Sequence, residues 1–156
     1  SDNSMQFRTD DAERLRITST GGVHFNNAEL IERVNIVANK LSAATSVNID
    51  LENGNVHHFT TTETTTSTPN IRVNSSTSLN SVMAIGDTIS VTLITTAAAA
   101  GYSAQLTIDG SAVTEKWNGG SAPSAGGSSG NDVYTYQIIK TADATYTVLA
   151  NVSNFA

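Results

Sequence analysis

The first part of the chain, up to residue 26, alternates apolar and polar residues in three short runs. Residues 5–8, 13–18 and 23–25 place apolar side chains at every second position, which is the period of a half-buried β-strand. Asp10-Asp11 and Gly21-Gly22 separate the runs, as turn residues do. Strands this short bury little surface, and an isolated hairpin is marginal in water. We therefore expect identical chains to complete this leader by wrapping around one another.

The next segment carries two conflicting patterns. Spacings of four, three and four residues, typical of one face of a helix, connect Leu30, Val34, Val37 and Leu41. Against a helix, residues 33–39 contain two asparagines and three β-branched residues, and both residue types weaken helices. The pattern favours extended chain over residues 28–42, and a helix stays the alternative.

Strand patterns become clear after residue 46. Residues 47–51 and 56–60 alternate, and Asn53-Gly54 between them favours a hairpin, because both residues tolerate positive φ. A bulge or loop at Asn53-Gly54 is the alternative. The threonine-rich stretch 60–68 has no preferred buried face, so we expect an exposed edge or loop there. Pro69 precedes residues 71–73, which we expect to form an edge strand.

The second half of the chain reads as further short strands. Leu79, Val82 and Met83 are spaced for one helical turn over the core. Alternating strands follow at 89–93, 106–108, 133–139 and 146–149, with a turn at Asp109-Gly110. Short strands separated by Gly, Asn and Asp predict an all-β fold with a β-sandwich-like globular domain. We expect a leader over residues 1–45 and the globular domain over 46–156.

Composition and charge remove several function classes. The chain of 156 residues has 14 acidic and 8 basic residues, a net charge of −6. Such a chain repels phosphate, so nucleic acid is not an expected partner. No cysteine is present, which excludes disulfides and thiolate metal sites. No stretch stays apolar for the ~20 residues of a membrane helix, so membrane insertion is not expected. The first residues lack the pattern of a signal peptide, so we expect none there. We interpret the chain as part of a longer protein.

The most distinctive stretch is the glycine- and serine-rich loop 118–130. Long loops in compact domains are functional or disordered, and glycine lets backbone amides approach a sugar or a protein surface closely. The candidate receptor-contact residues are Trp117, Asn118, Gly119, Gly120, Ser121, Ser124, Gly126, Gly127, Ser128 and Gly130. A flexible excursion is the alternative for the loop, and a core or interface anchor is the alternative for Trp117. The loop matches neither a phosphate-binding loop nor a dinucleotide fingerprint.

Other chemistry finds no support. His57 and His58 would face opposite sides of a strand and cannot chelate one ion together, and His24 is remote. We therefore expect exposed strand histidines. A metal site built from one histidine of each chain of a trimer is the weaker alternative. The acidic cluster around Asp50 lacks the glycine and glutamate positions of a calcium loop. No nucleophile-elbow pattern occurs, so we expect no catalytic residues, no metal and no cofactor.

Several segments resemble structural proteins of bacteriophages. Residues 13–23 resemble a segment that recurs in phage tail fibres and appendages. Residues 47–50, 70–73, 78–83, 108–110, 116–123 and 133–141 resemble, in the same order, a C-terminal module of structural proteins from marine phages, especially those of cyanobacteria. The resemblance implies a virion location, extracellular when mature and assembled in the host cytoplasm. It also implies a homotrimer with other virion proteins as partners.

These observations together predict a non-enzymatic tail-fibre component. Its short β leader would intertwine in a homotrimer, and its distal domain would contact a glycan or protein of the host surface. The alternative is a capsid-attached decoration or whisker fibre without a receptor-binding role.

Overall fold

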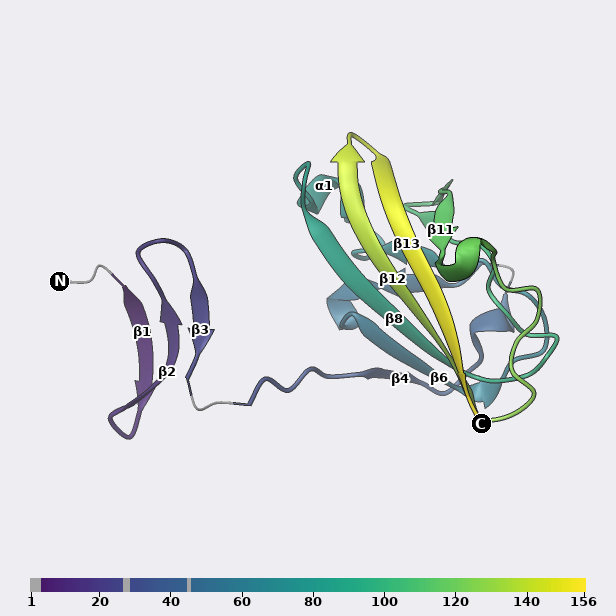
Figure 1. The fold of residues 1–156 in the computed structure, drawn as a ribbon, viewed down its shortest axis with the longest axis horizontal. Coiled ribbons are helices and arrows are strands. Elements are labelled where there is room, and N and C mark those ends of the chain that lie inside the picture. The colour runs from purple at the N-terminus through teal and green to yellow at the C-terminus, as the bar shows by residue number, and fades with distance from the viewer. Residues whose placement is uncertain (1–3, 27–28, 45) are drawn as a thin grey trace. The chain divides into compact units, whose positions relative to one another are not determined.

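The computed structural model describes residues 4–26, 29–44 and 46–156. The chain divides into two compact units, and the boundary between them in the sequence follows Glu32 (Figure 1). Both units are built from strands, and the described part contains one short α-helix. The all-β prediction is therefore confirmed. The division falls earlier than the expected position at residue 45, because residues 33–44 contribute a strand and a buried leucine to the second unit.

The first unit is a three-stranded antiparallel sheet in the order β1 (Met5–Thr9), β2 (Ala12–Ile17) and β3 (Val23–Phe25). Asp10 and Asp11 both take positive φ at the first turn, as a tight hairpin turn requires. At the second turn, Gly22 N–H donates to Thr18 Oγ1 over 2.9 Å. The strands predicted from alternation in the leader are confirmed.

The ambiguous segment is extended. Of the expected range 28–42, residue 28 lies outside the described residues, and 29–34 have no regular structure. Strand β4 (Asn35–Val37) follows, and then a single 3-10 turn, η1 (Leu41–Ala43). β4 pairs with a strand of the second unit and Leu41 is fully buried, so tertiary pairing overrides the helical spacing.

A six-stranded sheet forms one side of the second unit, in the order β11-β13-β12-β8-β6-β4 (Figure 1). Its further strands are β6 (Val56–Thr62), β8 (Thr88–Thr96), β11 (Glu115–Trp117), β12 (Asn131–Ala142) and β13 (Thr145–Phe155). The three longest, β8, β12 and β13, pair antiparallel, whereas β4, β6 and β11 join by parallel pairing. The strands predicted at 89–93, 133–139 and 146–149 are confirmed and extend further.

A four-stranded sheet faces the same core, in the order β10-β9-β7-β5. Its strands are β5 (Asn48–Asp50), β7 (Asn70–Arg72), β9 (Thr107–Ile108) and β10 (Ser111–Ala112). The predicted turn at Asp109-Gly110 connects β9 and β10, and both residues have positive φ. Asp109 also accepts hydrogen bonds from Leu79 N and Asn80 N, which fixes the start of helix α1 (Leu79–Val82) at the predicted helical turn.

The core lies between these two sheets. The six-stranded sheet contributes Phe59, Val91, Leu93, Tyr134, Tyr136, Ile138 and Val148, and the four-stranded sheet contributes Ile49, Ile71 and Ile108. From β4 to β8, successive strands alternate between the two sheets, so the chain crosses the core at every connection. No helix among the described residues is both long enough and apolar enough to cross a membrane.

Two local predictions are wrong. β5 and β6 belong to different sheets, so no hairpin forms at Asn53-Gly54. Instead η2 (Leu51–Asn53) closes a 3-10 turn, and Gly54 has φ of 111° and ψ of 168°. β7 lies between β5 and β9, so Pro69 does not precede an edge strand; its carbonyl accepts from Thr107 N.

The threonine-rich stretch is only partly exposed. Residues 60–62, at the end of β6, are exposed as expected. Glu63 and Ser67 are instead buried. Glu63 faces inward because two backbone amides, Leu41 N–H and Ser42 N–H, donate to its carboxylate over 2.7 Å each.

Candidate assembly and contact surfaces

One face of the first unit is mainly apolar. Residues paired across a sheet project to the same side. Met5 is aligned with Ile17 and Val23, and Phe7 is aligned with Leu15 and Phe25. All six side chains therefore share one face. Met5 is 58% exposed, Val23 56%, and Phe7 and Phe25 51% each. No described element of this unit covers that face, which we call the leader face.

The opposite face of the same sheet is polar and internally paired. Gln6, Arg16 and His24 form a row across its three strands. Arg16 Nη2 lies 2.5 Å from Glu13 Oε2, and Asn26 also donates to this carboxylate. The hydrogen bond from Arg16, together with its charge, lowers the pKa of Glu13 below its ordinary value. The sheet is thus amphipathic, and only its polar side is suited to water.

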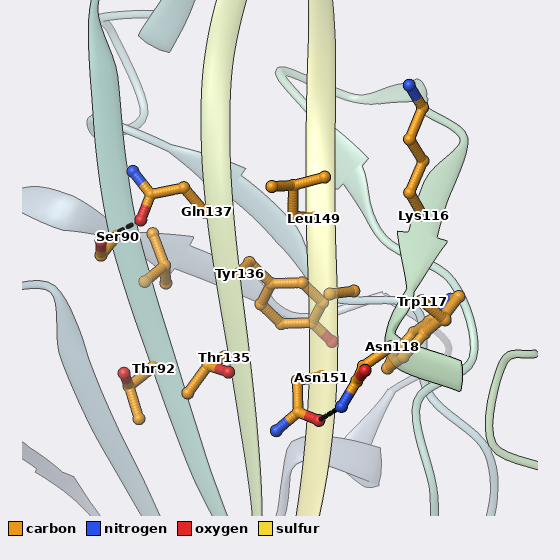
Figure 2. A pocket seen from close by; sticks show the side chains of 12 residues that line it. Ser90, Thr92, Lys116, Trp117, Asn118, Thr135, Tyr136, Gln137, Leu149 and Asn151 are labelled. Atoms are coloured by element: carbon orange, nitrogen blue, oxygen red, sulfur yellow. Dashed lines mark hydrogen bonds between the residues drawn. The ribbon is translucent and has the colours of Figure 1, made fainter. Parts of the chain in front are cut away.

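A shallow hollow of about 660 Å³ lies on the six-stranded sheet, beside β11 (Figure 2). Its floor is made by uncharged side chains of β8, β12 and β13, namely Ser90, Thr92, Thr135, Gln137, Leu149 and Asn151. Ser90 Oγ donates to Gln137 Oε1 over 2.6 Å, and Asn118 Nδ2 donates to Asn151 Oδ1 over 3.1 Å. Lys116 is the single charged side chain that lines it.

Trp117 and Asn118 are the two predicted contact residues that line this hollow. Trp117 also packs edge-on against Tyr136, with ring centroids 6.2 Å apart and an interplanar angle of 76°. Its strand β11 pairs with β13, and Trp117 is aligned there with buried Ala150. Trp117 therefore anchors β11 to the core while one edge of it borders the hollow.

The glycine-rich loop begins as a turn and ends tightly packed. Gly119 and Gly120, in the turn η3 (Asn118–Gly120), have φ of 76° and 82° with open space around them. Ser121, Ser124 and Ser128 are exposed. Gly119, Gly120, Ser121 and Ser124 leave the first part of the loop accessible, as a contact surface requires.

The last glycines of the loop pack against the chain itself. A Cβ on Gly126 would lie 2.4 Å from the carbonyl oxygen of Ala98, and one on Gly130 would lie 1.8 Å from that of Phe155. Gly127 N–H donates to the carboxylate of Asp132, which is fully buried. Glycine at 126, 127 and 130 therefore has a packing role, because a Cβ would clash at each of them, whereas it would meet open space at Gly119 and Gly120.

His57 and His58 face opposite sides of β6, as their spacing predicts. His57 points into the core, so the expectation of exposure is wrong for it, and His58 points to the outer side. His57 Nε2 donates to Gly54 O over 2.9 Å, and Asn35 Nδ2 donates to His57 Nδ1 over 3.0 Å, so the ring is held neutral. Burial lowers its pKa below the ordinary value. Within the described ranges, no three His, Cys, Asp or Glu residues are grouped as metal ligands.

Sequence reasoning missed three buried ionisable residues, Glu63, Asp132 and Lys140. Lys140 Nζ donates to Asn80 O over 2.7 Å and to Met83 O over 2.9 Å, which satisfies carbonyls at the end of α1. Glu63 accepts from the backbone amides of Leu41 and Ser42, and Asp132 accepts from the backbone amide of Gly127 and from the side chain of Asn154. Most of these partners are backbone groups, which no residue pattern reveals. They brace the fold and lie away from both surfaces described above.

The acidic residues around Asp50 are also accounted for. Asp50 Oδ1 pairs with Arg72 Nε over 2.5 Å, and Asn74 Nδ2 donates to Glu52 over 3.0 Å. These contacts connect β5 and β7 and leave no cluster of free carboxylates.

Comparison of the chain with protein-family models, with curated proteins and with solved structures yields no significant match.

Proposed function

We propose that this chain is a structural module of a bacteriophage tail fibre, and that it assembles as a homotrimer through the leader face. The observation that carries the proposal is the row pattern that gathers Met5, Phe7, Leu15, Ile17, Val23 and Phe25 on one uncovered side of a three-stranded sheet. The resemblance of the segments described above to phage appendage proteins supports the same reading.

The energetics favour a partner for this face. Units below about 40 residues rarely hold together without help. Five side chains of the leader face are between 37% and 58% exposed. Covering them would contribute about 1 kcal/mol each. Identical chains are the natural partner, because every copy presents the same face, and three sheets around a threefold axis can all turn that face inward.

The second unit supplies the distal part in this proposal. We interpret its two sheets as a β-sandwich-like domain that ends or stabilises the fibre. The accessible part of the loop, with Asn118, Gly119, Gly120, Ser121 and Ser124, is its candidate contact with a glycan or protein of the host surface. Other virion proteins would hold the module in the appendage, and no catalytic step is part of this role.

Measuring the mass of the assembly tests the proposal directly. Native mass spectrometry and sedimentation of the intact chain should give a trimer. The double variant Phe7→Ser/Phe25→Ser removes two aromatic side chains from the leader face and should give monomers. The matched control Gln6→Ser/His24→Ser changes the opposite face of the same strands and should stay trimeric. A monomeric parent chain at high micromolar concentration would refute the proposal.

One observation favours the alternative of a whisker or decoration fibre without a receptor-binding role. Gly126, Gly127 and Gly130 are held against the chain itself, which leaves only part of the loop for a ligand. Labelled antibodies against the chain would locate it on virions. Labelling at the capsid, with adsorption unaffected by the antibodies, would favour the decoration role over the tail-fibre role.

A further inference from the structure

The outward side of the six-stranded sheet has an unusual composition for this chain. Strand alternation turns Leu93 of β8 and Tyr136 of β12 into the core. The residues that alternate with them along each strand point outward. Aligned positions across the strands bring Ile36, Ile94, Thr135, Ile139, Leu149 and Phe155 to this side. We call it the outer face. Ile36, Leu149 and Phe155 are 66%, 46% and 59% exposed.

The outer face carries no carboxylate at any paired position of the described strands, although the chain has 14 acidic residues. Lys116 and His58 are its only ionisable side chains there. Aliphatic side chains alternate instead with threonine, serine and amide side chains. Depletion of charged residues is typical of the central part of a protein–protein interface.

The outward side of the four-stranded sheet differs sharply. There Asp50 is paired with Arg72 over 2.5 Å, and Glu52 accepts from Asn74 over 3.0 Å. Charged and hydrogen-bonded groups of this kind suit a side that faces water. Of the two outward sides of the second unit, only the outer face therefore has the composition of a surface that is covered in an assembly.

We propose that the outer face contacts the outer face of another copy of this chain. This inference rests on the proposed function, because the leader face would bring the copies together first. Residues 29–34 connect the two units without regular structure, and such short connections give effective concentrations near the millimolar range. A weakly adhesive surface then suffices. The lack of carboxylates also lets copies of a chain with net charge −6 approach at this face without direct repulsion.

A second copy explains the outer face better than an external ligand does. The hollow beside β11 is shallow, and two of its polar pairs, Ser90 with Gln137 and Asn118 with Asn151, already satisfy each other. Ile139, Ile94 and Ile36 lie outside the lining of the hollow, on β12, β8 and β4, so a small ligand in the hollow would leave them uncovered. An external ligand in the hollow is nevertheless a distinct outcome of the experiment below.

The test exploits the absence of cysteine from the chain. The Thr135→Cys variant places one thiol at the centre of the outer face, and Ser76→Cys places one in an exposed loop beside the four-stranded sheet. The rate of modification by a maleimide is measured for both in the assembled protein. We expect the thiol at position 135 to react at least about tenfold more slowly than the one at 76. Both should react equally fast in the Phe7→Ser/Phe25→Ser background at low micromolar concentration.

A second variant guards against indirect effects. Leu149→Asp adds a carboxylate to the outer face beside Gln137 and should raise the rate at position 135 to that at 76, while circular dichroism stays unchanged. Equal rates at 135 and 76 in an intact trimer would overturn this inference and leave the leader-face proposal standing, with the hollow open to an external ligand. A parent chain that is monomeric at all concentrations would overturn both.

Discussion

The carboxylate of Asp132 accepts hydrogen bonds from the backbone N–H of Gly127 and from Asn154 Nδ2, 2.6 Å away, while it is completely buried at the start of β12. This arrangement ties the end of the glycine-rich loop to both strands of the longest hairpin. The loop is therefore shaped by a charge inside the fold, in addition to the freedom of its glycines.

Asp132→Ala should destabilise the second unit by about 2–3 kcal/mol, because it removes a charged acceptor and leaves Gly127 N–H and the Asn154 amide without their partner. Urea unfolding monitored by tryptophan fluorescence measures the loss. Asp143→Asn is the control, since Asp143 accepts one exposed hydrogen bond from Asn80, and it should change stability by less than about 0.5 kcal/mol. Equal effects of the two substitutions would contradict a special role for Asp132.

Gly130 and Gly119 form a matched pair for a test of close packing. Their φ angles are 71° and 76°, so alanine meets the same backbone strain at both positions. Only Gly130 has a backbone atom, Phe155 O, where the Cβ would be. Gly119→Ala should cost about 1 kcal/mol, and Gly130→Ala about 3 kcal/mol or more. Denaturation midpoints of the two variants give the comparison. Similar midpoints would show that the end of β13 at Phe155 moves to accommodate the added Cβ without cost.

His57 should make the stability of the second unit depend on pH. Burial lowers the pKa of His57 in the folded state, so the unfolded chain binds the proton more readily. Stability should be complete above the ordinary histidine pKa and should fall as pH decreases below about 6.5. His57→Gln should reduce this dependence between pH 7 and 5, measured by urea midpoints. His58→Gln leaves the buried ring in place and should preserve it; an unchanged slope in His57→Gln would exclude His57 as the cause.

Glu63→Gln should loosen the segment after β4. The carboxylate accepts from Leu41 N–H and Ser42 N–H, and an amide can offer only one oxygen to these two donors. We expect a loss of about 1–2 kcal/mol and faster hydrogen exchange at both amides. Thr62→Ser, at the exposed neighbouring position, should leave both exchange rates unchanged. Exchange that stays slow in Glu63→Gln would show that the packing of Leu41 alone holds the segment.

The sequence predicted elements well where one side of a strand faces the core and the other faces outward. Ile89, Val91 and Leu93 alternate for that reason, and so do the residues of the leader. Asn53-Gly54 misled the prediction, because a turn signal is local and the pairing of β6 with β4 and β8 is not. Pro69 misled it similarly, since the interior place of β7 depends on strands far away in the chain.

The candidate contact residues were predicted as one loop, and the structure separates them. Trp117 and Asn118 border the hollow, whereas Gly126, Gly127 and Gly130 serve close packing. A glycine required by a neighbouring backbone and one left open to a ligand look identical in a sequence. The leader face was foreseen only as a shortage of buried surface, and its composition emerged once the register of β1, β2 and β3 was known.

The alternation of β4 to β8 between the two sheets has a consequence for how the second unit forms. The parallel pairs β4–β6 and β6–β8 each enclose a strand that belongs to the other sheet, so neither layer can be completed before its counterpart. Folding must bring distant segments together at once, a topology associated with passage times of milliseconds to seconds. Residues 33–156 should accordingly unfold in a single cooperative step, with no half-formed layer surviving by itself.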